Sequence, residues 1–533
     1  MPRRVKCDEL RPRCATCSKS DRECMYAPAT DSPADPKPSA SDSARTSTPP
    51  LQDDALATSS SPSVAKKSVT ADIDPQLFVN SPELLFDSPL TNVASVPSPN
   101  SAPLEWYDLL AEDAINNIDK YNLNLDIDRT CLSRRQSPVP EEETIDPVLD
   151  PSGQDRDVIN SSDEQWNCPE NIHLTNDQLV LFQHYISVVG PILDLYDSSK
   201  QLTTTLPRMA VRNVGVLKSL LAVAARHLAL ISEPQIHQLN LGEQIGRLES
   251  NASDANSFQN SLLQVATQYY YETLQYLSQN LLYPSYSKSR EIIATALLIS
   301  TYEMFDASGQ YSNGAWERHL RGIFWIQRSQ NNNGESHDPL RRAAWWCWIR
   351  QDTWVAFREG RRVLTIWRPT KRLMDLNANE LCLRILYICG RCVDFAANER
   401  KYDMITRIDQ GSKLLQALED WHHALPSSFQ PIYKVQLPEP GNLFAPIWIH
   451  PPSHAAAVQT FHFARIIVLI NQPSMGGMED FRARQRFLDE SVETVCGMAM
   501  MSQEKDLASA FADFQALYAG KPHVSLIYYI SRH

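Results

Sequence analysis

The sequence predicts an all-α fold class, with one large helical domain behind a small cysteine-rich head and a disordered linker. Four cysteines crowd the first 24 residues, and 17 of the 35 prolines fall between residues 28 and 151. From about residue 170 onward, apolar residues recur at the three- and four-residue spacing of helices. The 533 residues have room for two or three domains. We expect bounds of 1–26 for the head, 27–165 for the linker and 170–533 for the helical domain.

The head combines metal-ligand spacing with positive charge. Its cysteines, Cys7, Cys14, Cys17 and Cys24, read C-x6-C-x2-C-x6-C. Thiolates suit zinc, and a metal can fix a fold that is too small to have a core. The first 24 residues carry a net charge of +3, whereas the whole chain carries -13. A basic head on an acidic body suits local contact with phosphates.

The stretch RRVKCDELRPRCATCSKSDRECMY is similar to the fungal binuclear zinc cluster, the Zn(II)2Cys6 family of transcription factors. That family's pattern is C-x2-C-x6-C, a short proline-containing loop, then C-x2-C-x6-C. The resemblance implies that Cys7, Cys14, Cys17 and Cys24 are the third to sixth cysteines and that Pro12 falls in the loop. It also implies two zinc ions in an intact cluster.

The residues before Cys7 match the basic helix that enters the major groove in this family. The resemblance implies that Arg3 and Arg4 contact bases of CGG-type DNA sites and that Lys6 lies nearer the DNA backbone. It further implies a nuclear transcription factor that regulates transcription by RNA polymerase II.

The sequence departs from the family pattern because the first and second cysteines are missing. Four thiolates cannot close two tetrahedral zinc sites. We expect the missing cysteines to be encoded upstream of Met1, in a segment that the gene model has lost. Two alternatives stay open: a single zinc held by all four cysteines, and a regulatory protein without direct DNA binding that acts through protein partners.

The linker, residues 27–165, is rich in proline, serine, threonine and aspartate. Such a segment buries too little apolar surface to offset the entropy cost of folding, so we expect disorder. Two acidic-hydrophobic islands interrupt it, at 81–90 and 104–119.

The second island has a helical pattern, with Trp106, Leu109, Leu110, Ala114 and Ile118 on one face and acidic residues around them. Two interpretations stay open. The helix is either an activation segment that binds the transcription machinery or co-regulators, or a helix that docks on the protein's own helical domain.

The helical domain is predicted from six amphipathic segments: 262–282, 289–307, 313–329, 340–360, 379–399 and 454–472. Alternating strand patterns are nearly absent. Residues 260–475 also resemble the fungal-specific transcription factor domain, which implies a regulatory domain without established catalytic residues. No heptad repeat follows Cys24, so the sequence does not predict a coiled coil next to the head. Whether the protein forms a homodimer stays open.

The remaining side-chain patterns favour structural roles. Cys389 and Cys392 form C-G-R-C inside a predicted helix and are expected to be buried thiols. Four tryptophans are expected in the core: Trp345, Trp346, Trp348 and Trp354. His319 lacks catalytic partners in the sequence, and Arg361 and Arg362 are expected on a solvated surface. No catalytic motif and no run of about 18 apolar residues occurs, so we predict neither an enzyme nor a membrane protein.

Overall fold

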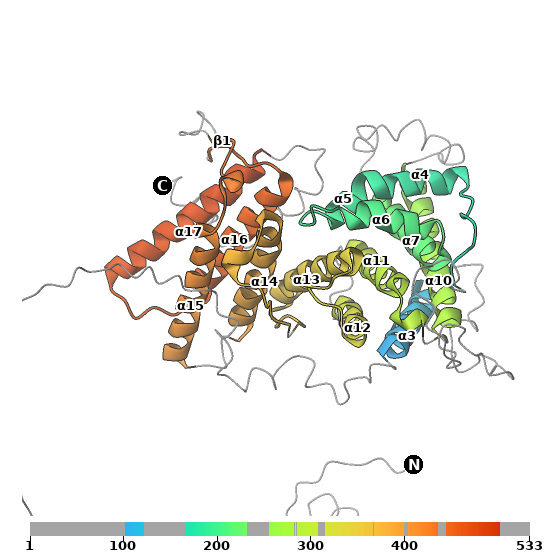
Figure 1. Ribbon diagram of the computed structural model, residues 1–533, viewed down its shortest axis with the longest axis horizontal. Coiled ribbons are helices and arrows are strands. Elements are labelled where there is room, and N and C mark those ends of the chain that lie inside the picture. The colour runs from blue at the N-terminus through green and yellow to red at the C-terminus, as the bar shows by residue number, and fades with distance from the viewer. Residues whose placement is uncertain are drawn as a thin grey trace, which may run out of the picture. The chain divides into compact units, whose positions relative to one another are not determined.

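The described residues form an all-α fold, as the sequence predicts (Figure 1). The computed structural model describes residues 102–121, 166–231, 255–281, 283, 285–306, 315–365, 367–398, 403–434 and 444–501. The α-helices are α3 (Ala102–Tyr121), α4 (Asn176–His184), α5 (Gly190–Leu193), α6 (Gln201–Ala210), α7 (Val214–Leu230), α10 (Ala255–Asn280), α11 (Arg290–Asp306), α12 (Ala315–Ser329), α13 (Pro339–Glu359), α14 (Ala378–Ala397), α15 (Met404–His423), α16 (Pro452–Asn471) and α17 (Met478–Ala499).

Short elements connect these helices. A π-helical segment, η3 (Tyr185–Val189), joins α4 to α5, and single 3-10 turns lie at η5 (Tyr286–Lys288), η6 (Leu373–Asp375) and η7 (Ser427–Phe429). The strands of the described chain are β1 (Tyr433–Lys434) and β2 (Ile447–Trp448), which pair antiparallel with Tyr433 opposite Trp448. All six helices predicted from periodicity are present, as α10 to α14 and α16.

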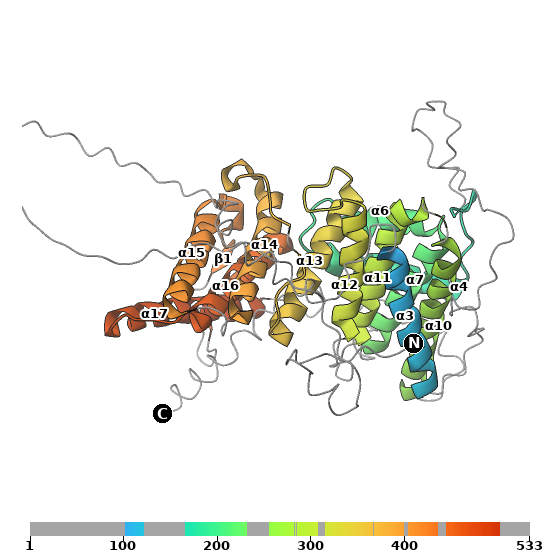
Figure 2. The ribbon, with the colours of Figure 1, turned by 90° about the horizontal axis from the view of Figure 1, so that it is seen from below.

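Two groups of helices build the described body (Figures 1 and 2). In the first group, α7 packs against α4, α6, α10 and α11. Thirteen of its 17 residues are buried, as expected of a helix that is apolar on every side. In the second group, α16 packs against α14, α15 and α17. It is long and apolar enough to cross a membrane, but most of it is buried, as in the core helix of a soluble protein.

Helix α13 lies between the two groups and contacts α6, α11, α12 and α14. Its ends are set locally. The Asp338 side chain accepts a hydrogen bond from the Arg341 N–H, and Pro339 occupies the first turn, where no backbone donor is needed. Gly360 ends the helix at φ 64°, a conformation that favours glycine.

Helix α3 docks on the first group, against α10 and α12. Trp106, Tyr107 and Leu110 are buried, and the Tyr271 hydroxyl of α10 donates a hydrogen bond to the Ala114 carbonyl at 3.1 Å. Gly322 of α12 makes room for the indole, because a Cβ there would lie 2.0 Å from Trp106 Cδ1. Of the two interpretations of 104–119, the structure therefore shows docking on the protein's own domain.

This docking changes the predicted boundary of the folded part. Residues 102–121 are expected within the linker, but buried side chains between Ala102 and Ala114 share the core of the helical domain. Trp166 is buried in the same core. The island at 81–90 and the rest of the linker up to residue 165 lie outside the described residues, apart from α3.

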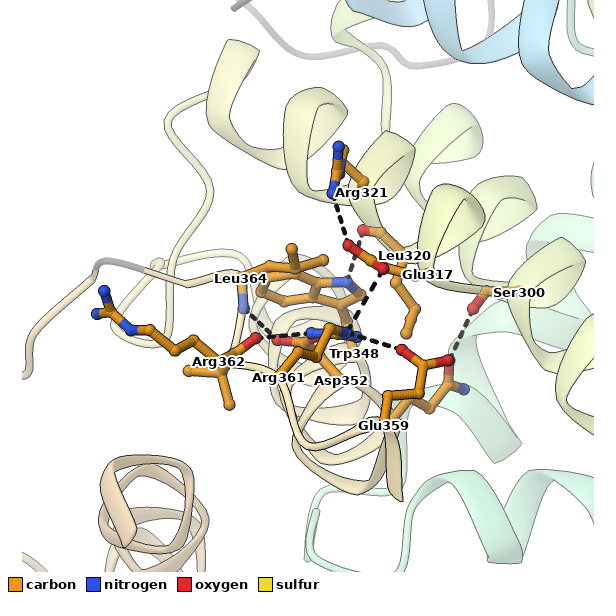
Figure 3. A network of polar contacts seen from close by, with 12 residues as sticks. Ser300, Glu317, Leu320, Arg321, Trp348, Asp352, Glu359, Arg361, Arg362 and Leu364 are labelled. Carbon is orange, nitrogen blue, oxygen red and sulfur yellow. Dashed lines mark hydrogen bonds and ion pairs between the residues drawn. The ribbon is translucent and has the colours of Figure 1, made fainter. Parts of the chain in front are cut away.

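A buried ion pair fixes the connection that leaves α13 (Figure 3). The Asp352 carboxylate contacts the Arg361 guanidinium at 2.9 Å and accepts a hydrogen bond from the Leu364 N–H at 2.6 Å. Arg361 also contacts Glu359 at 3.0 Å and Glu317 of α12 at 3.9 Å. Burial raises the pKa of Asp352, and Arg361 opposes that shift by favouring the charged form.

A second carboxylate, from α14, holds the next residue of the same connection. Asp394 accepts a hydrogen bond from the Val363 N–H at 2.8 Å and contacts Arg391 at 2.9 Å. The backbone N–H groups of Val363 and Leu364 are thus held by two different helices: Val363 by Asp394 of α14, and Leu364 by Asp352 of α13. A buried charge is costly unless it is paired and hydrogen-bonded, and both carboxylates meet that condition.

We predict that Gly322→Ala destabilises the protein, although alanine is the better helix former. The added Cβ must displace Trp106, and overpacking of this kind costs about 1–3 kcal/mol. Urea unfolding of the full chain measures the change. Gly390→Ala in α14 is the matched control, because its Cβ would meet its nearest neighbour at an ordinary 3.5 Å. Equal stabilisation by both substitutions would show that α3 does not dock as described.

We predict that Asp352→Asn lowers the free energy of unfolding by roughly 3 kcal/mol, the low end for a broken buried ion pair, because Arg361 keeps its contact with Glu359. The same change at Asp409, whose pair with Lys413 is largely exposed, should cost less than about 0.5 kcal/mol. Denaturant titration of the two variants makes the comparison. A loss at Asp352 no larger than the loss at Asp409 would contradict the role of the buried pair.

Candidate functional site

The predicted zinc ligands and DNA-contacting residues lie outside the described residues: Cys7, Cys14, Cys17, Cys24, Arg3, Arg4 and Lys6. By their chemistry, thiolates at these spacings are the donor type that zinc takes. Within the described ranges, no group of three or more His, Cys, Asp or Glu side chains is placed to hold a metal ion. The metal prediction therefore depends on the head alone.

The C-G-R-C sequence lies inside α14, as predicted, and both of its thiols are buried. Burial raises the pKa of Cys389 and of Cys392 far above the usual range of a thiol. Burial also raises the pKa of Cys382, which lies earlier in α14, to about 12. A thiol that stays protonated is a poor nucleophile, so these cysteines are structural.

The four tryptophans of α13 are core residues. Trp348 is fully buried, and its indole N–H donates to the Leu320 carbonyl of α12 at 3.0 Å (Figure 3). Trp345 packs against Trp348, with ring centroids 5.2 Å apart. The prediction of core packing is confirmed, and Trp346, which is 7% exposed, also lines the pocket described below.

His319 is also a core residue. It is buried in α12, and burial, with a contribution from Arg318, lowers its pKa to about 3. The ring is therefore neutral at physiological pH and is shielded from solvent, which does not suit an acid–base catalyst.

The expectation that Arg361 and Arg362 are solvated is wrong. Only 13% of the Arg361 side chain and 14% of the Arg362 side chain are exposed, and both face the carboxylates of the α13–α14 connection. Their partners, Asp352 and Asp394, lie on two different helices. The sequence alone did not show that these helices converge.

A pocket of about 290 Å³ lies at the junction of the two helical groups. Its wall comes from five segments: the turn between α5 and α6, the turn after α12, helix α13, the stretches on either side of η6 and the first turns of α14. Arg342 and Trp346 of α13 face it together with Trp367 and with Arg384 of α14. Sequence reasoning missed this pocket. Arg342 and Trp346 are four residues apart, which places them on one helix face, but nothing local indicates which segments meet that face.

Two domain families match the chain. The fungal Zn(2)-Cys(6) binuclear cluster domain matches residues 2–33, and the fungal specific transcription factor domain matches residues 180–345. The second match begins upstream of the stretch 260–475 on which the resemblance was based. No curated protein and no solved structure matches the chain closely enough to indicate a relative.

The first match covers all four cysteines of the head, and zinc is the metal that this domain binds. The second covers the helices from α4 to the first turns of α13. Both families are transcription factor families, which generally are not enzymes and which imply a role in the nucleus. The two matches support a fungal transcription factor that binds DNA through a zinc cluster.

Proposed function

We propose that this protein acts in the nucleus as a sequence-specific regulator of transcription by RNA polymerase II and that it reads CGG-type sites. One observation carries the proposal: a zinc-cluster match with a net positive charge precedes a helical domain of the regulatory type. Cys7, Cys14, Cys17 and Cys24 are the proposed zinc ligands. The domain bounds that we propose are 1–26 for the zinc module and 170–533 for the helical domain, with α3 as an added part of the latter.

Arg3, Arg4 and Lys6 are the proposed DNA contacts. A guanidinium pairs with the O6 and N7 atoms of guanine, which makes arginine the residue type suited to a G-rich triplet. Lysine beside them suits a phosphate, where a point charge is enough.

The helical body is proposed to regulate without catalysing. Its candidate catalytic groups, Cys389, Cys392 and His319, are buried, with pKa values shifted so that the thiols stay protonated and the ring stays neutral. This burial supports a regulatory role over an enzymatic one.

Co-regulators of transcription are proposed partners of residues 104–119. The apolar face of α3 is covered by α10 and α12, whereas Asp108 and Glu112 are exposed. A partner that contacts docked α3 would therefore bind its acidic side, and a basic surface would suit that side.

A second copy of the chain is a further proposed partner. A measurement of the oligomeric state in solution tests this proposal.

DNA binding by a full chain whose cluster is completed with the first two cysteines of the family pattern tests the proposal. Arg4→Ala should weaken binding to a CGG-containing duplex by about 1–3 kcal/mol and reduce discrimination against a mutated triplet. Lys6→Ala should weaken both complexes alike and lower the salt slope by about one. Lys66→Ala, a charge change outside the zinc module, is the control. Fluorescence anisotropy at several salt concentrations measures all four proteins.

Mass spectrometry of the intact protein reports its zinc content in parallel. Zinc-loaded protein without CGG-dependent binding would overturn the proposal and would favour a regulator that acts through protein partners. Equal effects of Arg4→Ala and Lys66→Ala would overturn the assigned DNA contacts.

A further inference from the structure

The pocket at the junction of the helical groups has the dimensions of a small-molecule site. Its volume of about 290 Å³ lies near the lower end of the range of ligand pockets, about 300–1,000 Å³. That space suits a small metabolite. Small-molecule sites commonly combine apolar or aromatic walls with a few polar groups that fix orientation.

One wall of the pocket is aromatic and rigid. Trp346 and Trp367 meet edge to face, with ring centroids 5.7 Å apart, and the Trp346 indole N–H donates to the Gly334 carbonyl at 3.0 Å. Gly334 is required there, because a Cβ would lie 2.7 Å from Trp367 and 2.8 Å from Trp346. A fixed indole surface favours a planar ring in the ligand.

The carboxylates of the pocket, Asp197, Glu335 and Glu380, already have partners. Asp197 accepts hydrogen bonds from the backbone N–H groups of Ser199 and Gln201, at 3.0 and 3.2 Å. Glu335 accepts hydrogen bonds from the backbone N–H groups of Thr370 and Lys371, at 2.9 and 3.2 Å, and from the Thr370 hydroxyl at 2.5 Å. Glu380 contacts the Lys371 ammonium at 2.5 Å and accepts from the Asn377 N–H at 3.0 Å. These oxygens are engaged with the protein, so they do not call for a cationic ligand.

The two arginines of the pocket make fewer hydrogen bonds with the protein, although Glu380 acts electrostatically on both of them and Glu335 acts on Arg384. Within the described residues, Arg342 makes one hydrogen bond, to the Ser336 carbonyl at 3.0 Å, and Arg384 makes one, to the Lys371 carbonyl at 2.8 Å. A guanidinium carries five N–H donors, and its fork matches the two oxygens of a carboxylate. Burial lowers the pKa of Arg384, and nearby groups, Glu335 first, oppose that shift; an anion bound beside Arg384 would favour its charged form further.

We propose that this pocket binds a small aromatic carboxylate, with its ring against Trp346 and Trp367 and its carboxylate on Arg342 and Arg384. Because α13 and α14 both contribute to the wall, an occupied pocket ties the two helical groups together. The ligand is thus an effector of the helical domain. Its binding requires no DNA, so its absence would leave the proposed DNA-binding function standing.

Calorimetry and thermal unfolding of the full chain with benzoate and indole-3-acetate test the proposal. We expect both probes to bind and to raise the melting temperature, and we expect benzamide and benzylamine, at the same concentration, to do neither. Arg342→Gln should weaken benzoate binding roughly 10- to 100-fold, as expected for lost hydrogen bonds to a charged group. Arg384→Gln should act in the same direction.

Arg358→Gln, an exposed change near the end of α13 and outside the pocket, is the matched control and should leave affinity unchanged. Arg342 is only half-buried, so its variant is informative even if Arg384→Gln fails to fold. The proposal is overturned if neither carboxylate binds at millimolar concentration, if benzamide binds as well as benzoate, or if Arg342→Gln and Arg358→Gln bind alike.

Discussion

Two buried carboxylates, Asp352 and Asp394, hold consecutive backbone N–H groups in the connection between α13 and α14. Asp352 is paired with Arg361 and Asp394 with Arg391, so each buried negative charge lies beside a positive one. A connection of loop type usually faces water, because its backbone donors need partners. Here the helices supply those partners, and the first part of the connection, at Val363 and Leu364, is able to lie inside the junction of the two groups.

The position of this connection determines which side chains of α13 and α14 lie together at the junction. It fixes the end of α13 relative to α14, and those two helices contribute Arg342 and Arg384 to the same pocket. Other contacts reinforce the arrangement. The Tyr196 hydroxyl, which follows α5, lies 2.7 Å from the Thr460 hydroxyl of α16, so the first group also touches the core helix of the second. The pocket is therefore a product of how the groups join.

Much of the helical domain could be predicted from the sequence because its signals are local. Apolar spacing places the six amphipathic helices, and Asp338, Pro339 and Gly360 mark the ends of α13. The cysteines of the head indicate zinc for the same reason, since the ligands of a small metal site are close in the chain. The indole and thiol side chains of α13 and α14 were likewise expected in the core, and they lie there.

The features that escaped prediction depend on residues far apart in the chain. Arg361 and Arg362 read as surface charges because nothing near them identifies Asp352 and Asp394 as their partners. Helix α3 left two interpretations open, since an amphipathic helix fits a partner's groove and its own domain equally well. Gly322 of α12, more than 200 residues later, provides the space for Trp106. The pocket needs five segments to converge, and spacing within any one of them does not report that.

Hydrogen exchange of the full chain tests the central claim, that buried carboxylates hold the α13–α14 connection as part of the core. The amide hydrogens of Val363 and Leu364 should exchange as slowly as those in the middle of α13, near Trp348, because opening either one requires the junction to come apart. Exchange as fast as that of Met475, an exposed loop residue, would contradict the account.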